Sequence, residues 1–231
     1  MLFNLLQAAA DSAALSQMTP AQEEMKLSLI ELASKGGWLM IVLLLLSFVA
    51  IYIFGSKWWL IRKAGQINRN FMRDIRDLIH DGKIKSALEL CRSYNSPVAR
   101  LVEKGIERIG RPLQDIQTAV ENTGSVEVAR LEKGLPMLAT IAGGAPMIGF
   151  LGTVTGMISA FFNMSVAGNN IDITLLSGGI YEAMVTTVGG LFVGIIAYFG
   201  YNYLTSQISN LVFKMESTTI EFIDMLHEPA I

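Results

Sequence analysis

Charge, cysteine and histidine are all scarce in this sequence of 231 residues. Charged residues make up 16% of the chain, against about 25% in an average soluble protein. The single cysteine, Cys91, excludes an internal disulfide framework and suits a reducing compartment. His80 and His227 lie far apart, with no cysteines or carboxylates at ligand spacing. We therefore expect no metal site.

Patterns typical of several other functions are also missing. The glycine-rich stretch 143–156 is not followed by Gly-Lys-Ser/Thr, so a phosphate-cradling loop is not expected. The net charge is −2 and no basic tract carries interleaved aromatics, which argues against a nucleic-acid partner. Cys91 has no neighbouring histidine and fits a helix core position. Without a nucleophile and base pair, we expect neither an enzyme nor a cofactor.

What the chain has instead is apolar sequence, and it is unevenly distributed. Hydrophobic residues make up 52% of the chain. Three stretches, 36–56, 134–163 and 175–204, carry almost no charge and exceed or match the roughly 20 residues that a transmembrane helix needs. Aromatic residues stand near the ends of the first and third stretches, at Trp58, Trp59, Tyr201 and Tyr203. No alternating strand pattern is present, so we predict an all-α integral membrane protein with three transmembrane helices.

The distribution of Lys and Arg predicts the orientation. Most of these residues lie in segment 57–133, and the loop 164–174 has none. The positive-inside rule therefore places 57–133 and the C-terminal helix 205–231 in the cytoplasm, and segment 1–35 outside. Segment 1–35 is predicted to carry a short amphipathic helix at 21–33. Segment 57–133 is predicted to be helical, with solvated charged faces and with a last helix that continues through Arg130 toward the second span.

The second and third spans each gather small residues on one helical face. Gly152–Gly156 and Gly190–Gly194 form GxxxG pairs, which let two helices approach closely. Two interpretations remain open: simple packing of the two helices, or a wetted lumen or binding surface for another polar helix. The pore-facing or packing set is Pro146, Gly149, Gly152, Gly156, Gly189, Gly190 and Gly194, and the polar set is Thr153, Glu182, Thr186 and Thr187.

Glu182 is the most informative member of this set. It precedes an uncharged run that extends from 183 to 213. An ionised carboxylate inside a membrane is costly, and such residues usually face a bundle interior or an ion pathway. We therefore treat Glu182 as a candidate functional residue.

Two motifs give the chain a family resemblance. Residues 149–157 (GFLGTVTGM) and 179–187 (GIYEAMVTT) resemble the ExbB/TolQ/MotA family of ion-driven motor channel proteins, and within it the ExbB branch. The stretches 130–135 and 138–142 fit the same family, as do Tyr201 and Asn202. One position departs: Ile196 stands where proteins of the ExbB branch often have proline.

The resemblance implies a multi-pass protein of the bacterial inner membrane, with a periplasmic N-terminus. It implies a homo-oligomer, typically a pentamer, that surrounds the single transmembrane helices of an ExbD-like partner. The partner supplies an aspartate that takes up and releases the ion. Proton flow then drives motion that a TonB-like protein passes to outer-membrane transport. The positions that match the family's polar lining are Thr153, Glu182 and Thr187.

Two other functions remain compatible with the sequence. One is a TolQ-like subunit of an envelope-constriction motor, because the same channel architecture serves different partners. The other is a non-conducting membrane scaffold, in which Glu182 and the threonines serve assembly only. The sequence leaves the choice between H⁺ and Na⁺ open.

Overall fold

The computed structural model describes residues 37–65, 68, 70–167 and 173–227, which form helices and the short connections between them. The amphipathic helix predicted at 21–33 lies outside the described residues. The all-α prediction is confirmed for the described part of the chain. Its helices are α3 (Gly37–Ala64), α4 (Phe71–His80), α5 (Ile84–Ser93), α6 (Pro97–Ile106), α7 (Leu113–Glu132), α8 (Leu135–Ala167) and α9 (Ile173–His227).

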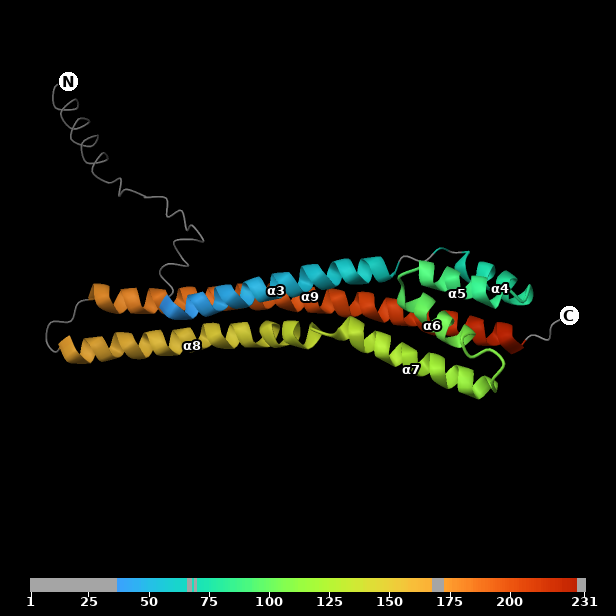
Figure 1. The fold of residues 1–231 in the computed structure, drawn as a ribbon. Coiled ribbons are helices and arrows are strands. Elements are labelled where there is room, and N and C mark those ends of the chain that lie inside the picture. Colours follow the sequence, from blue (N-terminus) through green and yellow to red (C-terminus); the bar gives the residue numbers. More distant parts are fainter. Residues whose placement is uncertain (1–36, 66–67, 69, 168–172, 228–231) are drawn as a thin grey trace, which may run out of the picture.

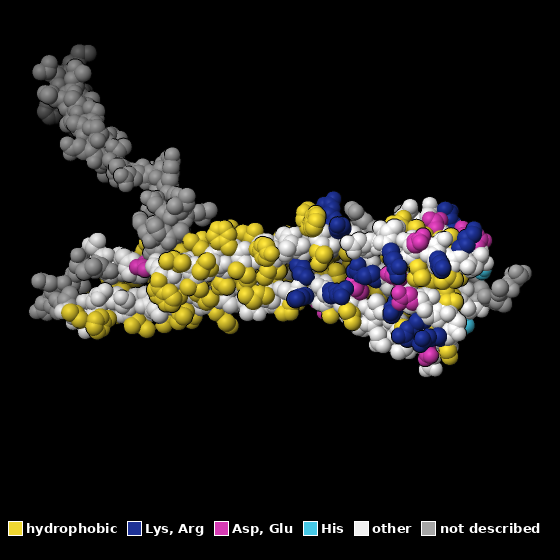
Figure 2. Space-filling view, in the orientation of Figure 1, with side chains coloured by type: hydrophobic (Ala, Val, Ile, Leu, Met, Phe, Trp, Pro, Cys, Tyr) yellow, Lys and Arg dark blue, Asp and Glu magenta, His cyan; other side chains and the backbone are white. Residues whose placement is uncertain are grey.

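Three long helices, α3, α8 and α9, run side by side along the molecule (Figure 1). Each has the length and apolar composition to cross a membrane, which confirms the prediction of three candidate spans. Bulky apolar side chains face outward from this bundle, as Figure 2 shows on the visible face. Among the exposed ones are Phe48, Phe150, Ile158, Val188, Phe192 and Phe199. The positions and sides of the membrane boundaries stay predictions.

Helix α9 continues without interruption across the boundary predicted at 204/205. Its 55 residues correspond to about 80 Å of helix, far more than the roughly 30 Å of a hydrocarbon core. The expected C-terminal helix is therefore an extension of the third span. Because the extension is rigidly continuous, any tilt of the span moves the far end of α9 as well.

The connection between α7 and α8 lies at the boundary between segment 57–133 and the second apolar stretch. The predicted helix through Arg130 toward the second span is α7, which ends at Glu132, and α8 begins at Leu135. Gly134 has a φ of 95°, a left-handed conformation that interrupts the helix and that glycine adopts readily. The Nζ of Lys57 donates to the carbonyl oxygens of Arg130 and Leu131, at 3.2 and 3.4 Å. A cation from α3 thus satisfies carbonyl groups that the end of α7 leaves free.

Helices α4 to α7 and the C-terminal part of α9 form a compact unit at one end of the bundle, here termed the helical head (Figure 1). Its core joins α4, α6 and α9 through buried side chains such as Phe71, Val102 and Phe222. The connections fall where the sequence predicts breaks. Gly82 and Gly110 adopt positive φ values of 73° and 97°, and Pro97 is the first residue of α6.

The head contains a buried ion cluster that the sequence did not indicate. We expected charged residues of this region to be solvated, but Glu127 is only 4% exposed. Its two carboxylate oxygens accept hydrogen bonds from Arg100 and Arg130, at 2.5 and 2.8 Å. Removing one partner of a buried pair usually destabilises a fold strongly, because the other charge stays behind without compensation. This cluster therefore fixes α6 against α7.

Cys91 provides a test of the packing of the head. The side chain is 1% exposed, and burial, assisted by the negative charge of Glu103, raises the pKa of the thiol from 9.0 to about 12. The thiolate is the nucleophile. Because the pKa is about three units higher, the folded protein contains about a thousandfold less thiolate than the unfolded chain. We expect iodoacetamide at pH 8 to modify the native protein at least about a hundredfold more slowly than the denatured protein, as measured by intact mass.

The sign of the linked stability effect follows from the raised pKa of Cys91. The buried Cys91 thiol contributes fully to stability below the unfolded pKa of 9.0. This contribution is lost as the pH rises through about 12, because the thiol then ionises. Equal labelling rates for native and denatured protein would show that the head is open around α5.

Candidate functional site

The small faces of α8 and α9 pack directly against each other. At their centre the two backbones are so close that a Cβ atom on Gly190 would lie 2.6 Å from the carbonyl oxygen of Ala145 and 2.8 Å from the Cα of Gly149. A Cβ on Gly149 would in turn lie 3.0 Å from the carbonyl oxygen of Thr186. Within this chain, the glycines of the predicted set therefore serve close helix packing.

Gly152, Gly156 and Gly194 also lie in this contact. A Cβ on Gly152 would be 2.6 Å from the Thr186 side chain, and one on Gly156 would be 2.8 Å from Ala183. A Cβ on Gly194 would be 2.5 Å from the ring of Pro146. Gly189 is different, because its nearest neighbour is Met40 on α3.

Two threonine hydroxyls meet across the same contact. Thr153 on α8 and Thr187 on α9 have their Oγ1 atoms 3.0 Å apart. The Thr187 hydroxyl also lies 3.0 Å from the carbonyl oxygen of Gly149, and the Thr153 hydroxyl lies 2.7 Å from that of Phe150. Each hydroxyl has one proton, so at any moment only two of these three contacts can be hydrogen bonds. The pair can therefore exchange between hydrogen-bond arrangements without moving the helices.

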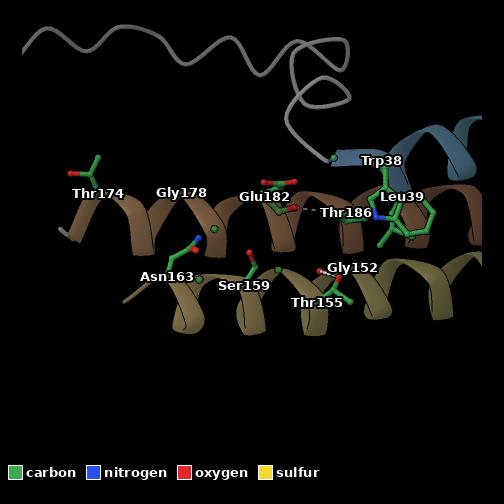
Figure 3. Close-up of a pocket in the computed structure, with 14 residues that line it drawn as sticks. Trp38, Leu39, Gly152, Thr155, Ser159, Asn163, Thr174, Gly178, Glu182 and Thr186 are labelled. Carbon is green, nitrogen blue, oxygen red and sulfur yellow. Dashed lines mark hydrogen bonds between the residues drawn. The ribbon is translucent and has the colours of Figure 1, made fainter. Parts of the chain in front are cut away.

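Glu182 lies on α9 but outside the contact of Thr153 and Thr187. Five residues along a helix correspond to about 140° of rotation, so Glu182 and Thr187 lie at opposite edges of the small face. The Glu182 carboxylate is directed away from α8, toward the start of α3 (Figure 3). A Cβ on Gly37, the first residue of α3, would lie 2.5 Å from Glu182 Oε1. The free N–H groups and the dipole at a helix N-terminus favour a negative charge there.

Glu182 lines a pocket of about 590 Å³ that contains both apolar and polar residues. The pocket lies between α8, α9 and the first turn of α3, and Figure 3 shows Ser159 and Asn163 pointing from α8 toward α9. Thr186 lines the pocket at its buried end, where the residue is 2% exposed. The Thr186 hydroxyl donates to the carbonyl oxygen of Glu182 at 2.9 Å. The polar and charged lining comprises Thr155, Ser159, Asn163, Thr174, Glu182 and Thr186.

Comparison with known proteins identifies the family. Residues 93–217, which include α8 and most of α9, match the MotA/TolQ/ExbB proton channel family. The chain belongs to this family.

Several members of the MotA/TolQ/ExbB family are similar over different lengths. A protein named as a homolog of biopolymer transport protein ExbB, from Methanothermobacter thermautotrophicus, is 28% identical over 193 residues, which cover 82% of this chain and 67% of the relative. Biopolymer transport protein ExbB of Neisseria meningitidis is 27% identical over 180 residues, covering 72% and 79%. Tol-Pal system protein TolQ of Haemophilus influenzae is 36% identical over 104 residues, covering 45% of each chain.

The MotA/TolQ/ExbB family is a proton channel family and not an enzyme class. The three long apolar helices agree with a multi-pass membrane protein. No group of three or more His, Cys, Asp or Glu side chains suited to a metal ion occurs among the residues that the structure describes.

The structure divides the predicted polar set into two groups. Thr153 and Thr187 form one pair inside the contact of α8 and α9, whereas Glu182 and Thr186 line the pocket beside α3. Sequence reasoning did not single out Thr155 and Ser159, which share that pocket. A signal for them exists, because Thr155, Ser159 and Asn163 follow one another at four-residue spacing and so share one face of α8.

Proposed function

We propose that this chain is the proton-channel subunit of an inner-membrane motor that works with an ExbD-like partner to energise TonB-dependent outer-membrane transport. The names of its ExbB relatives support this role. In this proposal several copies, five in the arrangement that the resemblance implies, surround the membrane helices of the partner. The positive-inside rule places the helical head in the cytoplasm and the N-terminus in the periplasm.

The observation that carries the proposal is the threonine pair between α8 and α9. Thr153 and Thr187 share two protons among three hydrogen-bonding contacts. Such a pair relays a proton, or holds a water molecule, without a change in helix packing. Polar side chains inside membrane proteins commonly mark ion pathways, and Glu182 supplies an ionisable group one to two helical turns toward the outer end of α9.

The energy available suits a small mechanical step. One proton charge that crosses about 100 mV releases about 2.3 kcal/mol. Equilibria between two protein conformations commonly differ by a few kcal/mol. In the proposed motor, protonation of the partner's aspartate biases one such step, and the rigid helix α9 carries the motion to the helical head.

A TolQ-like motor is the second candidate. The 36% identity to TolQ of Haemophilus influenzae exceeds the 27% identity to ExbB of Neisseria meningitidis, although it extends over 104 rather than 180 residues. Both candidates use the same channel and differ in the protein that receives the motion. Complementation separates them: rescue of iron-complex uptake in a strain without its own ExbB subunit favours the first, and rescue of envelope constriction in a strain without TolQ favours the second.

Proton flux tests the channel itself. The protein is reconstituted into vesicles with and without its ExbD-like partner, a K⁺ diffusion potential is imposed, and an internal pH dye reports flux. We expect flux at least about tenfold above that of empty vesicles only when both proteins are present. The double variant Thr153→Ala/Thr187→Ala is expected to assemble but to lose most of this flux.

A matched double variant, Thr153→Ser/Thr187→Ser, keeps both hydroxyls and is expected to conduct. If the wild-type complex assembles yet shows no flux above empty vesicles, the non-conducting scaffold is the correct function. If the alanine variant conducts fully, the threonine pair is a packing feature only.

A further inference from the structure

A second pocket lies where the transmembrane bundle meets the helical head. It has a volume of about 360 Å³ and is formed by the end of α3, the start of α6 and the end of α7. Its volume falls within the range of small-ligand pockets, roughly 300–1,000 Å³. Apolar side chains on the bundle side, Trp59 and Leu60, are joined there by the charged residues Lys63, Arg100, Glu127 and Arg130. We call it the junction pocket.

The junction pocket has a surplus of positive charge. Its lining contains three cations and one carboxylate, which leaves two positive charges in excess. Glu127 is occupied by both arginines, yet the Arg130 side chain remains 66% exposed. Lys63 stands over the ring of Trp59, with its Nζ 5.4 Å from the ring centroid. Within the described part of the chain, the buried Nε of Arg100 has no hydrogen-bond acceptor.

The pocket lies at the depth of lipid headgroups. The uncharged part of α3, from 37 to 56, is 20 residues long, or about 30 Å of helix, which matches one hydrocarbon core. Trp59 and Lys63 follow about 5–10 Å beyond it, where the polar headgroup layer lies. Tryptophan prefers this layer. Figure 2 shows lysine and arginine side chains gathered where the hydrophobic surface ends.

We propose that the junction pocket binds the phosphate headgroup of an anionic phospholipid from the leaflet on the side of the helical head. Lys63 and Arg130 contact the phosphate, while Trp59 and Leu60 contact the glycerol backbone and the first acyl carbons. A phosphodiester with an uncharged headgroup, as in phosphatidylglycerol, neutralises part of the surplus charge. The choline group of phosphatidylcholine brings a further cation to a site that is already positive.

A lipid in this position would bridge two helices. Its phosphate would join α3 to α7, and its acyl chains would extend along the apolar surface of the bundle. The lipid would therefore fix the helical head relative to the membrane surface. This inference does not depend on proton conduction, because it rests on the junction pocket alone.

Native mass spectrometry of the full-length protein in detergent tests the site. The protein is titrated separately with phosphatidylglycerol, phosphatidylcholine and the soluble headgroup analogue glycerol 3-phosphate. We expect phosphatidylglycerol to bind at least about tenfold more tightly than phosphatidylcholine, and glycerol 3-phosphate to bind weakly because it lacks acyl chains. Lys63→Gln and Arg130→Gln are each expected to weaken phosphatidylglycerol binding about fivefold.

The control is Arg111→Gln, which removes an exposed arginine in the connection between α6 and α7, outside the lining of the junction pocket, and is expected to leave binding unchanged. Lys63→Gln breaks no ion pair among the described residues and, unlike Arg130→Gln, leaves both arginine partners of the buried Glu127 in place. Equal binding of the two lipids, or an equal effect of Arg111→Gln, would overturn the proposal. Glycerol 3-phosphate binding as tight as that of phosphatidylglycerol would overturn it in favour of a soluble-phosphate site.

Discussion

Replacing Gly190 with alanine is expected to destabilise the protein by about 3 kcal/mol and to lower its melting temperature by roughly 6–12 °C. The added Cβ would lie 2.6 Å from the carbonyl oxygen of Ala145 and 2.8 and 3.0 Å from the Cα and N of Gly149. All three are backbone atoms, so no side chain can rotate away. The two helices would have to separate along their tightest contact. Thermal unfolding of the purified protein in detergent measures the effect.

Gly178→Ala is the matched control on the same helix. A Cβ at Gly178 meets no atom within 4 Å, and alanine in a helix interior is favoured over glycine by about 0.5–1 kcal/mol. The same substitution is therefore expected to leave the melting temperature unchanged or to raise it slightly. A melting temperature for Gly190→Ala within about 1 °C of wild type would show that α8 and α9 are not in backbone contact at this position.

Local sequence signals predicted much of the fold. Long uncharged runs identified the three membrane-spanning candidates, because burying charge in lipid is costly and membrane spans therefore contain few charged residues. Gly82, Pro97 and Gly110 marked helix breaks in the head, since each limits or frees the backbone locally. The left-handed conformation of Gly134 was not predicted, because a single glycine beside a helical pattern does not reveal a φ of 95°. What fixes that turn is a long-range contact, the Lys57 side chain at the end of α7.

The candidate site was less predictable, because it depends on the register between helices. The sequence pattern gathered small residues on one face of each helix, but it did not show which of them meet. Only the packing shows that Thr187 meets Thr153 while Glu182 faces the start of α3. The buried Glu127 was missed for the same reason, since its partner Arg100 lies 27 residues away on α6. A charged residue in a charged segment carries no local sign of burial.

Glu182→Gln is expected to reduce partner-dependent proton flux by at least about tenfold without preventing assembly. Glutamine has nearly the shape of glutamate but cannot bind and release a proton near neutral pH. Glu182 is exposed within its pocket, and the hydroxyl of Thr186 donates to its backbone carbonyl, which the substitution retains. The substitution therefore removes a charge and keeps this hydrogen bond. The measurement is dye-reported flux in vesicles that contain the protein and its ExbD-like partner.

Glu216→Gln makes the same change on the same helix, at an exposed position in the helical head, and is expected to conduct like wild type. Comparing the two variants separates the effect of losing the charge at position 182 from the effect of reducing the net charge of α9. Size-exclusion chromatography of both complexes establishes that assembly is intact before flux is compared. If Glu182→Gln conducts as well as Glu216→Gln, the carboxylate serves only as the polar contact at the first turn of α3. The proton would then pass by the pair of Thr153 and Thr187 alone.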